Sequence, residues 1–195
     1  MIVCGDADDL DNDETQSTFV CYYNDSNKAT DNVAPHPIME EFMADTKDNS
    51  KTALVGELNG LLADHFALFI KTKNFHWHVK GPRFHDLHLL FDTQALEVRD
   101  QIDLIAERVR KLDADTLTSI GTMGKHTKIK DQDSTKLSAE DMIAELLADN
   151  ETVIARLKGM KDLAEEAGDN ATDGLLDDWT DMAEQRAWFL RSLLA

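Results

Sequence analysis

The most constraining feature of this sequence is a long helical pattern over residues 84–112, which contains no glycine and no proline. Residues four apart lie on the same face of an α-helix. His88 and Asp92 form one such polar pair, and Asp103 and Glu107 form another. Eleven residues separate Asp92 from Asp103, which at about 100° per residue returns the helix to nearly the same azimuth. Both polar pairs are therefore predicted to lie on one stripe of one helix.

The two polar pairs of one chain cannot share a single metal ion. At about 1.5 Å rise per residue, about 16 Å separates Asp92 from Asp103, whereas metal–ligand bonds are close to 2 Å long. If two copies of the helix cross antiparallel about a two-fold axis, His88 and Asp92 of one copy face Asp103 and Glu107 of the other. The spacing is thus compatible with a site that two subunits share.

An ordinary solvated helix face is the alternative interpretation, and it is the commoner meaning of a charged i,i+4 pair. Here the carboxylates interrupt an apolar stripe, and a carboxylate at a packed surface needs a partner or a cation. This context favours a metal site. The apolar residues concerned are Leu89, Leu96, Ile102, Leu104, Ile105 and Val109.

The rest of the chain predicts an all-α fold. Apolar residues recur at helical spacing over residues 50–79, 83–112, 138–167 and 172–194. Gly81-Pro82 separates the first two helices, and Gly168 ends the third. Residues 113–137 read as a long crossover that carries one short helix near residues 116–120. Four helices with one long crossover form a ferritin-like four-helix bundle.

The N-terminal segment has a different composition. Residues 1–50 hold 12 acidic residues against 2 lysines, a net charge of −10, and they show no sustained period. We expect residues 1–49 to be a disordered acidic extension and residues 50–195 to be the folded domain. The short apolar patch Ser17–Tyr23 is either a brief strand or a docking contact, and Met39 and Met43 are alternative start residues.

Charge and composition exclude several classes of protein. A formal charge of −18 disfavours binding to nucleic acid and favours the attraction of cations. No apolar run of about 18 residues predicts a membrane span, and the acidic start does not resemble a secretory signal. Cys4 and Cys21 form no CxxC pair, so a reducing, cytoplasmic location is expected.

The motifs resemble those of one known family. No Glu-x-x-His occurs in the chain, which argues against a di-iron site inside the bundle. The chain does contain the run Phe75-His76-Trp77, the turn Gly81-Pro82, then His88, Asp92 and the Asp103–Glu107 pair. From about residue 50 to the C-terminus, these motifs and their spacing resemble the Dps family, the DNA-binding proteins from starved cells, or mini-ferritins.

The resemblance implies a hollow homododecamer in the bacterial cytoplasm that oxidises Fe(II), with hydrogen peroxide preferred over oxygen, and stores ferric mineral. It implies a ferroxidase centre with His76, His88 and Asp92 from one subunit and Asp103 and Glu107 from its two-fold mate. Imidazole and carboxylate suit iron as ligands. Trp77, beside a ligand, is either an interface aromatic or a redox-active electron donor.

Two further expectations concern iron entry and DNA. Family members carry acidic pores at three-fold axes, and Asp169, Asp173 and Asp177 have the spacing to line one; an ordinary solvated helix start is the alternative. DNA binding, by which a nucleoid-associated protein would compact DNA, is the alternative function. The acidic charge disfavours it. A third hypothesis is a structural assembly with an inactive metal site.

Overall fold

The computed structural model describes the backbone of residues 2–3, 22–23 and 37–195, and the side chains from Asp48 onward. The chain separates into two compact units, Met1–Glu40 and Glu41–Ala195. In the first unit, strand β1 (Ile2–Val3) pairs antiparallel with strand β2 (Tyr22–Tyr23). Part of the predicted patch Ser17–Tyr23 is therefore a short strand, and its other residues lie outside the described ones.

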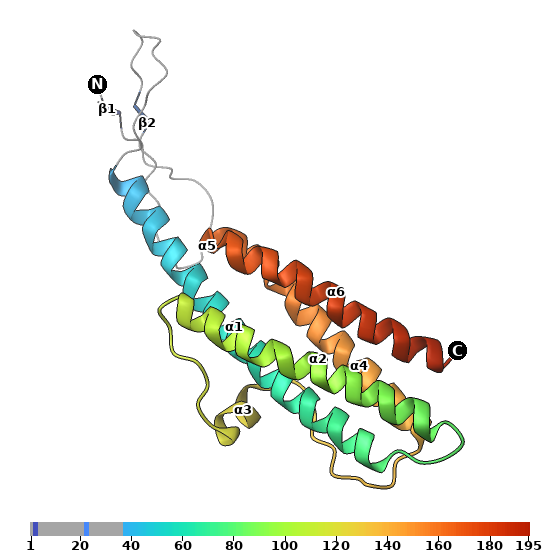
Figure 1. The fold of residues 1–195 in the computed structure, drawn as a ribbon. Coiled ribbons are helices and arrows are strands. Elements are labelled where there is room, and N and C mark those ends of the chain that lie inside the picture. The colour runs from blue at the N-terminus through green and yellow to red at the C-terminus, as the bar shows by residue number, and fades with distance from the viewer. Residues whose placement is uncertain (1, 4–21, 24–36) are drawn as a thin grey trace, which may run out of the picture. The chain divides into compact units, whose positions relative to one another are not determined.

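Every regular element between residues 37 and 195 is a helix, and this confirms the all-α prediction (Figure 1). The four long helices run alongside one another, and a long connection joins the second to the third, as in a ferritin-like bundle. The helices are α1 (Pro37–His78), α2 (Phe84–Lys111), α3 (Ile120–His126), α4 (Ala139–Gly159), α5 (Lys161–Ala167) and α6 (Asn170–Leu193).

Helix α1 begins at Pro37, thirteen residues before the predicted start near Ser50. Proline suits the first position of a helix because its missing N–H would have no partner there. The acidic pair Glu40 and Glu41 follows close behind, and negative charge is favourable near a helix N-terminus. The structure therefore describes residues 37–49 as part of helix α1, and the boundary between an N-terminal extension and the folded domain near residue 50 stays a prediction.

Ion pairs and hydrogen bonds close the four long helices into a ring. Lys73 of α1 contacts Asp92 of α2, and Arg108 of α2 contacts Asp169 before α6. Arg186 of α6 donates to Asn150 of α4 at 2.9 Å. Arg156 of α4 completes the ring through Asp64 of α1. Leucine, isoleucine, valine and phenylalanine side chains from all four helices fill the interior and provide most of the driving force for folding.

The crossover between α2 and α4 is tied to α1 along its length. Asp64 accepts hydrogen bonds from the hydroxyl of Thr127 at 2.9 Å and from the amide of Lys128 at 2.6 Å. The short helix on this crossover, α3, begins at Ile120 and not near residue 116 as predicted. Ser119 sets that start because its hydroxyl accepts the amide of Thr122.

The helix predicted over residues 138–167 is interrupted once. Its start at Ser138 is confirmed, since the hydroxyl accepts the amide of Asp141 at 3.0 Å. The break between α4 and α5 falls at Met160, whose amide is shared among three preceding carbonyls, next to the weak helix former Gly159. Gly168 then ends α5 with a φ of 68°, a conformation that favours glycine.

By length and composition alone, the segment Asp48–His78 of α1 could cross a membrane, although no uninterrupted apolar run predicted one. Of its most apolar stretch, 56% is buried inside the bundle. The packing of this helix in the core of the bundle therefore explains why the segment is so apolar.

Candidate metal centre

The last turn of α1 and the first turns of α2 bring two histidines into contact. The rings of His76 and His88 stack with centroids 3.8 Å apart and an interplanar angle of 19°. The Nδ1 of His76 lies 2.7 Å from the carbonyl oxygen of His88, and the Nδ1 of His88 lies 2.8 Å from the carbonyl oxygen of His76. The tight turn at Gly81, with a φ of 108°, makes this approach possible.

These reciprocal bonds fix the chemistry of both rings. A carbonyl oxygen can only accept a hydrogen bond, so each Nδ1 carries the proton and donates it. In the neutral imidazole, each Nε2 then keeps a free lone pair, which is the state that binds a metal ion. His76 and His88 are therefore held in the tautomer of metal ligands.

Asp92 lies one helical turn beyond His88 and completes this half of the site. One of its carboxylate oxygens is 3.9 Å from Nε2 of His76. The same oxygen accepts a hydrogen bond of 2.6 Å from the ammonium of Lys73, which is the main reason that the pKa of the Asp92 carboxyl is lowered. Asp92 is therefore ionised and available at neutral pH.

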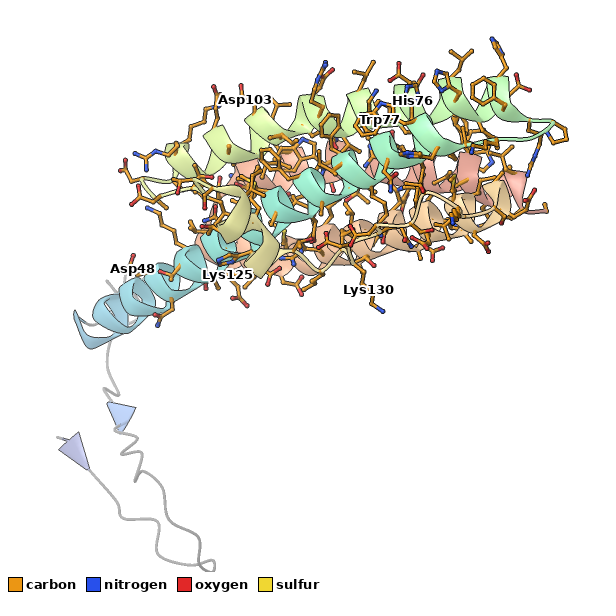
Figure 2. All side chains as sticks on the ribbon, turned by 90° about the horizontal axis from the view of Figure 1, so that it is seen from below. Asp48, His76, Trp77, Asp103, Lys125 and Lys130 are labelled. Atoms are coloured by element: carbon orange, nitrogen blue, oxygen red, sulfur yellow. The ribbon has the colours of Figure 1, made fainter. Side chains whose placement is uncertain are left out.

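Asp103 and Glu107 lie further along α2, with both side chains exposed. Glu107 pairs with Lys111 at 3.2 Å within the same helix, and Asp103 has no ion pair within residues 48–195. Among the described residues, no three histidine, cysteine, aspartate or glutamate side chains form a ready-made metal cage. The chain thus brings three of the five predicted ligands together and leaves two apart on the same helix. Figure 2 shows His76, Trp77 and Asp103 on the same side of the bundle.

The other histidines of this region have different surroundings. His65 is fully buried, and its ring nitrogens lie 2.9 Å from the carbonyl of Leu61 and 3.0 Å from the side chain of Gln101. Burial, reinforced by the charge of Arg186, lowers the pKa of His65 to about 4. Both ring nitrogens of His65 thus have neighbours within the bundle, which fits a structural role. His85 is exposed next to Asp86.

The acids of the predicted pore all have partners in the folded chain. Asp169 caps α6 through the amide of Thr172 and binds Arg108 with both carboxylate oxygens, at 2.6 and 2.7 Å. Burial alone would raise the pKa of Asp169, but these bonds outweigh it and hold the pKa below its usual value. Lys161 lies 2.7 Å from both Asp173 and Asp177. The pore assignment stays a prediction.

Lys73 belongs to this candidate site, and the sequence pattern did not show its role. The sequence places Lys73 near the end of the first predicted helix, but it does not reveal the contact with Asp92. A usable signal existed, because Lys73 precedes His76 by three residues and therefore shares its helix face.

Comparison with known proteins supports one assignment. A family model described as a ferritin-like domain matches residues 55–195. A DNA protection during starvation protein of Brevibacillus brevis is 32% identical over 137 residues, which cover 70% of this chain and 91% of the relative. An uncharacterized low temperature-induced protein of a Nostoc strain is 34% identical over 148 residues, covering 75% of this chain and 83% of the relative.

Solved structures agree with this assignment. The Dps protein of Thermosynechococcus elongatus matches with a TM-score of 0.74 and 30% identity, over 76% of this chain and 94% of that one. A Dps protein of Vibrio cholerae, described as a member of a broad superfamily of ferritin-like diiron-carboxylate proteins, matches with a TM-score of 0.72 and 26% identity. That alignment covers 75% of this chain and 92% of the Vibrio chain.

Proposed function

The chain belongs to the Dps family of ferritin-like proteins, and from that premise we propose that it is a ferroxidase and an iron-storage protein. It oxidises Fe(II) at sites shared by two subunits and stores the ferric product as mineral inside a hollow assembly of twelve subunits. His76, His88 and Asp92 come from one subunit, and Asp103 and Glu107 come from its two-fold partner. Consumption of Fe(II) and peroxide together protects the cell against oxidative damage.

The observation that carries the proposal is the half-site on the α1–α2 hairpin. Two imidazoles present free Nε2 atoms beside an ionised carboxylate, and this donor set suits Fe(II). The two exposed carboxylates on the same stripe of α2 supply the oxygen ligands that the harder Fe(III) product prefers. An antiparallel pair of α2 helices is the arrangement that unites the two halves.

Hydrogen peroxide is the proposed oxidant. One peroxide accepts one electron from each of two Fe(II) ions, its O–O bond breaks, and two protons convert the products to two water molecules. The electrons, oxygen atoms and protons of this reaction balance with Fe(II), peroxide and two protons alone. Asp92 contributes a fixed negative charge, and Lys73 holds it in place until iron displaces the ammonium.

DNA compaction in the nucleoid is the alternative function, and the name of the Brevibacillus relative keeps it open. A charge of −18 per chain argues against it, because a phosphate backbone repels such a surface. We propose a cytoplasmic location and protection through iron chemistry. A gel shift of plasmid DNA that disappears at higher salt would instead support the alternative.

The deciding measurement is stopped-flow oxidation of Fe(II) by size-fractionated protein, with hydrogen peroxide compared with dissolved oxygen at equal iron loading. We expect rapid peroxide-driven oxidation by a particle of about twelve subunits. A folded assembly that oxidises Fe(II) no faster than buffer would refute the ferroxidase proposal and favour an inactive structural role.

Complementation tests whether the site spans subunits. One variant carries His88→Ala with Asp92→Ala, and the other carries Asp103→Ala with Glu107→Ala; each is expected to assemble normally and to lose rapid oxidation. Mixed assemblies of the two variants should recover a share of the wild-type rate, because some interfaces then contain one complete site. Sites built within one chain would recover nothing.

A further inference from the structure

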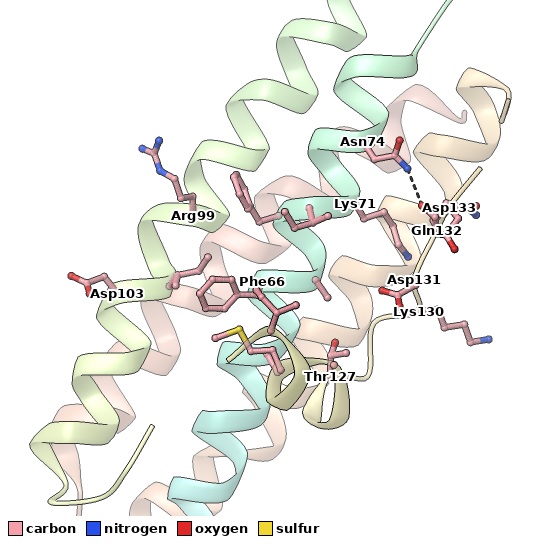
Figure 3. Close-up of a pocket in the computed structure, with 18 residues that line it drawn as sticks. Phe66, Lys71, Asn74, Arg99, Asp103, Thr127, Lys130, Asp131, Gln132 and Asp133 are labelled. Atoms are coloured by element: carbon pink, nitrogen blue, oxygen red, sulfur yellow. Dashed lines mark hydrogen bonds between the residues drawn. The ribbon is translucent and has the colours of Figure 1, made fainter. Parts of the chain in front are cut away.

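A groove beside Asp103 has no role in the proposed iron chemistry. It encloses a cavity of about 560 Å³ between α1, α2, α3 and the crossover (Figure 3). Its lining is mostly apolar, and Asp103 lies at its α2 edge. The apolar residues that matter are Phe66, Phe69, Ile70, Ile102, Ile120 and Met123. Ile120 is 78% exposed, so the α3 side of this groove is uncovered in a single chain.

Trp77 is a second apolar side chain that residues 48–195 leave largely uncovered. It follows the ligand His76 directly, and its side chain is 61% exposed, on the same side of the bundle as Asp103 (Figure 2). A tryptophan buries a large area when it is covered and therefore contributes strongly to an interface. An indole placed next to a metal ligand and left open to solvent indicates that another surface covers it.

The geometry of the shared site determines which surface that is. If His88 of one subunit faces Glu107 of the other in an antiparallel pair, the two-fold axis crosses α2 at the midpoint of these positions. This midpoint lies between Glu97 and Val98. His76 stacks on His88, so Trp77 lies at the same level as the start of α2. The two-fold axis therefore places Trp77 opposite the Asp103–Glu107 end of the partner, where the groove begins.

Charge around the groove is mixed. Its mouth carries the exposed carboxylates Asp103, Asp131 and Asp133, and also the exposed cations Arg99 and Lys130. At the end of the α1–α2 hairpin, Arg83 pairs with Glu140 and His85 lies beside Asp86. The apolar groups, and not a difference in net charge, therefore make the two surfaces suited to each other.

We propose that, in the two-fold pair, the indole of Trp77 docks against the partner's Ile120 and the partner's Met123, at the Asp103 end of the groove. This inference rests on the proposed function, since it uses the same antiparallel pair of helices. The docked indole covers the water-facing side of the shared site and holds His76 against the partner's carboxylates. Trp77 is thereby a positioning residue of the site.

The proposal predicts a specific disulfide between subunits. In a background with Cys4→Ser and Cys21→Ser, the double variant Trp77→Cys with Ile120→Cys should form a covalent dimer on mild oxidation, because disulfides form only between closely approaching residues. Both side chains are largely exposed, so the substitutions leave the core intact. The matched control is Trp188→Cys with Ile120→Cys, since Trp188 is 60% exposed on α6, and it should not form dimers at comparable yield.

A third variant separates this inference from the proposed function. Leu96 is 38% exposed and lies next to the predicted two-fold axis, so Leu96→Cys should cross-link to its own copy whenever the α2 helices pair antiparallel. Dimers from Leu96→Cys but none from the Trp77–Ile120 pair would overturn the docking of Trp77 and leave the shared site standing. No dimers from either would overturn both, and dimers from both would support both.

Discussion

The outward stripe of α2 and the seam between α1 and α4 both concentrate charge, but in opposite ways. In the seam, Arg156 contacts Asp64 at 2.8 Å and Glu57 at 2.8 Å, and Lys71 contacts Asp149 at 2.7 Å. Asp64 is completely buried, and these charges are paired within the chain. We use the name seam for these five residues.

The stripe, defined by His88, Asp92, Asp103 and Glu107 of α2, with His76 of α1 stacked on His88, is incomplete within one chain. Asp103 has no ion pair within residues 48–195, and each imidazole leaves an Nε2 free. Burial of a charge is costly unless it is paired, so the loss of one partner in the seam should destabilise the fold. Asp92 and Glu107 of the stripe also have lysine partners, but their side chains remain accessible to solvent. Burial of the ion pair, and not pairing alone, therefore distinguishes the seam from the stripe.

The largest expected effect comes from breaking the seam. Arg156→Met leaves the carboxylate of Asp64 buried without its partner, and we expect the free energy of unfolding to fall by about 3–5 kcal/mol. Urea denaturation at fixed protein concentration measures this. The control Lys158→Met removes a surface ion pair with Glu184 and should cost less than about 1 kcal/mol. Equal losses from both variants would show that burial of the pair has no energetic consequence.

Acid should weaken the bundle interior through His65. Its pKa is about 4 in the folded chain and 6.5 when unfolded, so between these values the unfolded chain binds more protons. Stability is then lost as pH falls from about 6.5 to about 4, by about 3 kcal/mol at most. His65→Gln should flatten this part of the stability–pH curve. An unchanged slope in the variant would mean that the carboxylates alone cause the acid sensitivity.

Two glycines of α1 should respond oppositely to the same substitution. A Cβ at Gly60 would lie 1.8 Å from Nη1 of Arg156, whereas a Cβ at Gly56 meets nothing within 4 Å. Gly60→Ala should destabilise by about 1–3 kcal/mol because the guanidinium must leave its place in the seam. Gly56→Ala should stabilise by about 0.5–1 kcal/mol through helix propensity. The thermal unfolding temperatures of the two variants, each compared with that of the original chain, test this prediction. Stabilisation by Gly60→Ala would show that the Arg156 side chain can move aside without cost.

The smallest effect concerns the ammonium of Lys73, which pairs with Asp92 of the stripe. Lys73→Met frees the carboxylate of Asp92 and removes a positive charge beside the incoming cation. Fe(II) should then bind several-fold more tightly, up to about tenfold, as measured by anaerobic calorimetric titration. Lys80→Met, an exposed change in the connection between α1 and α2, is the control. Weaker binding by the Lys73 variant would instead assign Lys73 a part in orienting Asp92.

Some features were missed because their signals are tertiary or weak. The seam joins residues such as Asp64 and Arg156 that are far apart in sequence, and no local pattern marks which surface charges will be buried together. The start of α3 depended on Ser119 as a cap within a polar crossover, where several serines and threonines could serve equally. The contact of Asp169 with Arg108 required the relative placement of α2 and α6, whereas its cap on the amide of Thr172 is a local signal.

The sequence by itself determined the four-helix pattern, the turn at Gly81-Pro82 and the alignment of four polar residues on one stripe of α2. Helical periodicity and fixed rise per residue are local rules, so spacing alone is sufficient for these features. Only the tertiary structure decided that His76 and His88 fix each other's tautomers, that Lys73 holds Asp92, and that Arg156 is neutralised in the seam. Those facts depend on distances between separate helices, which packing of the whole core sets.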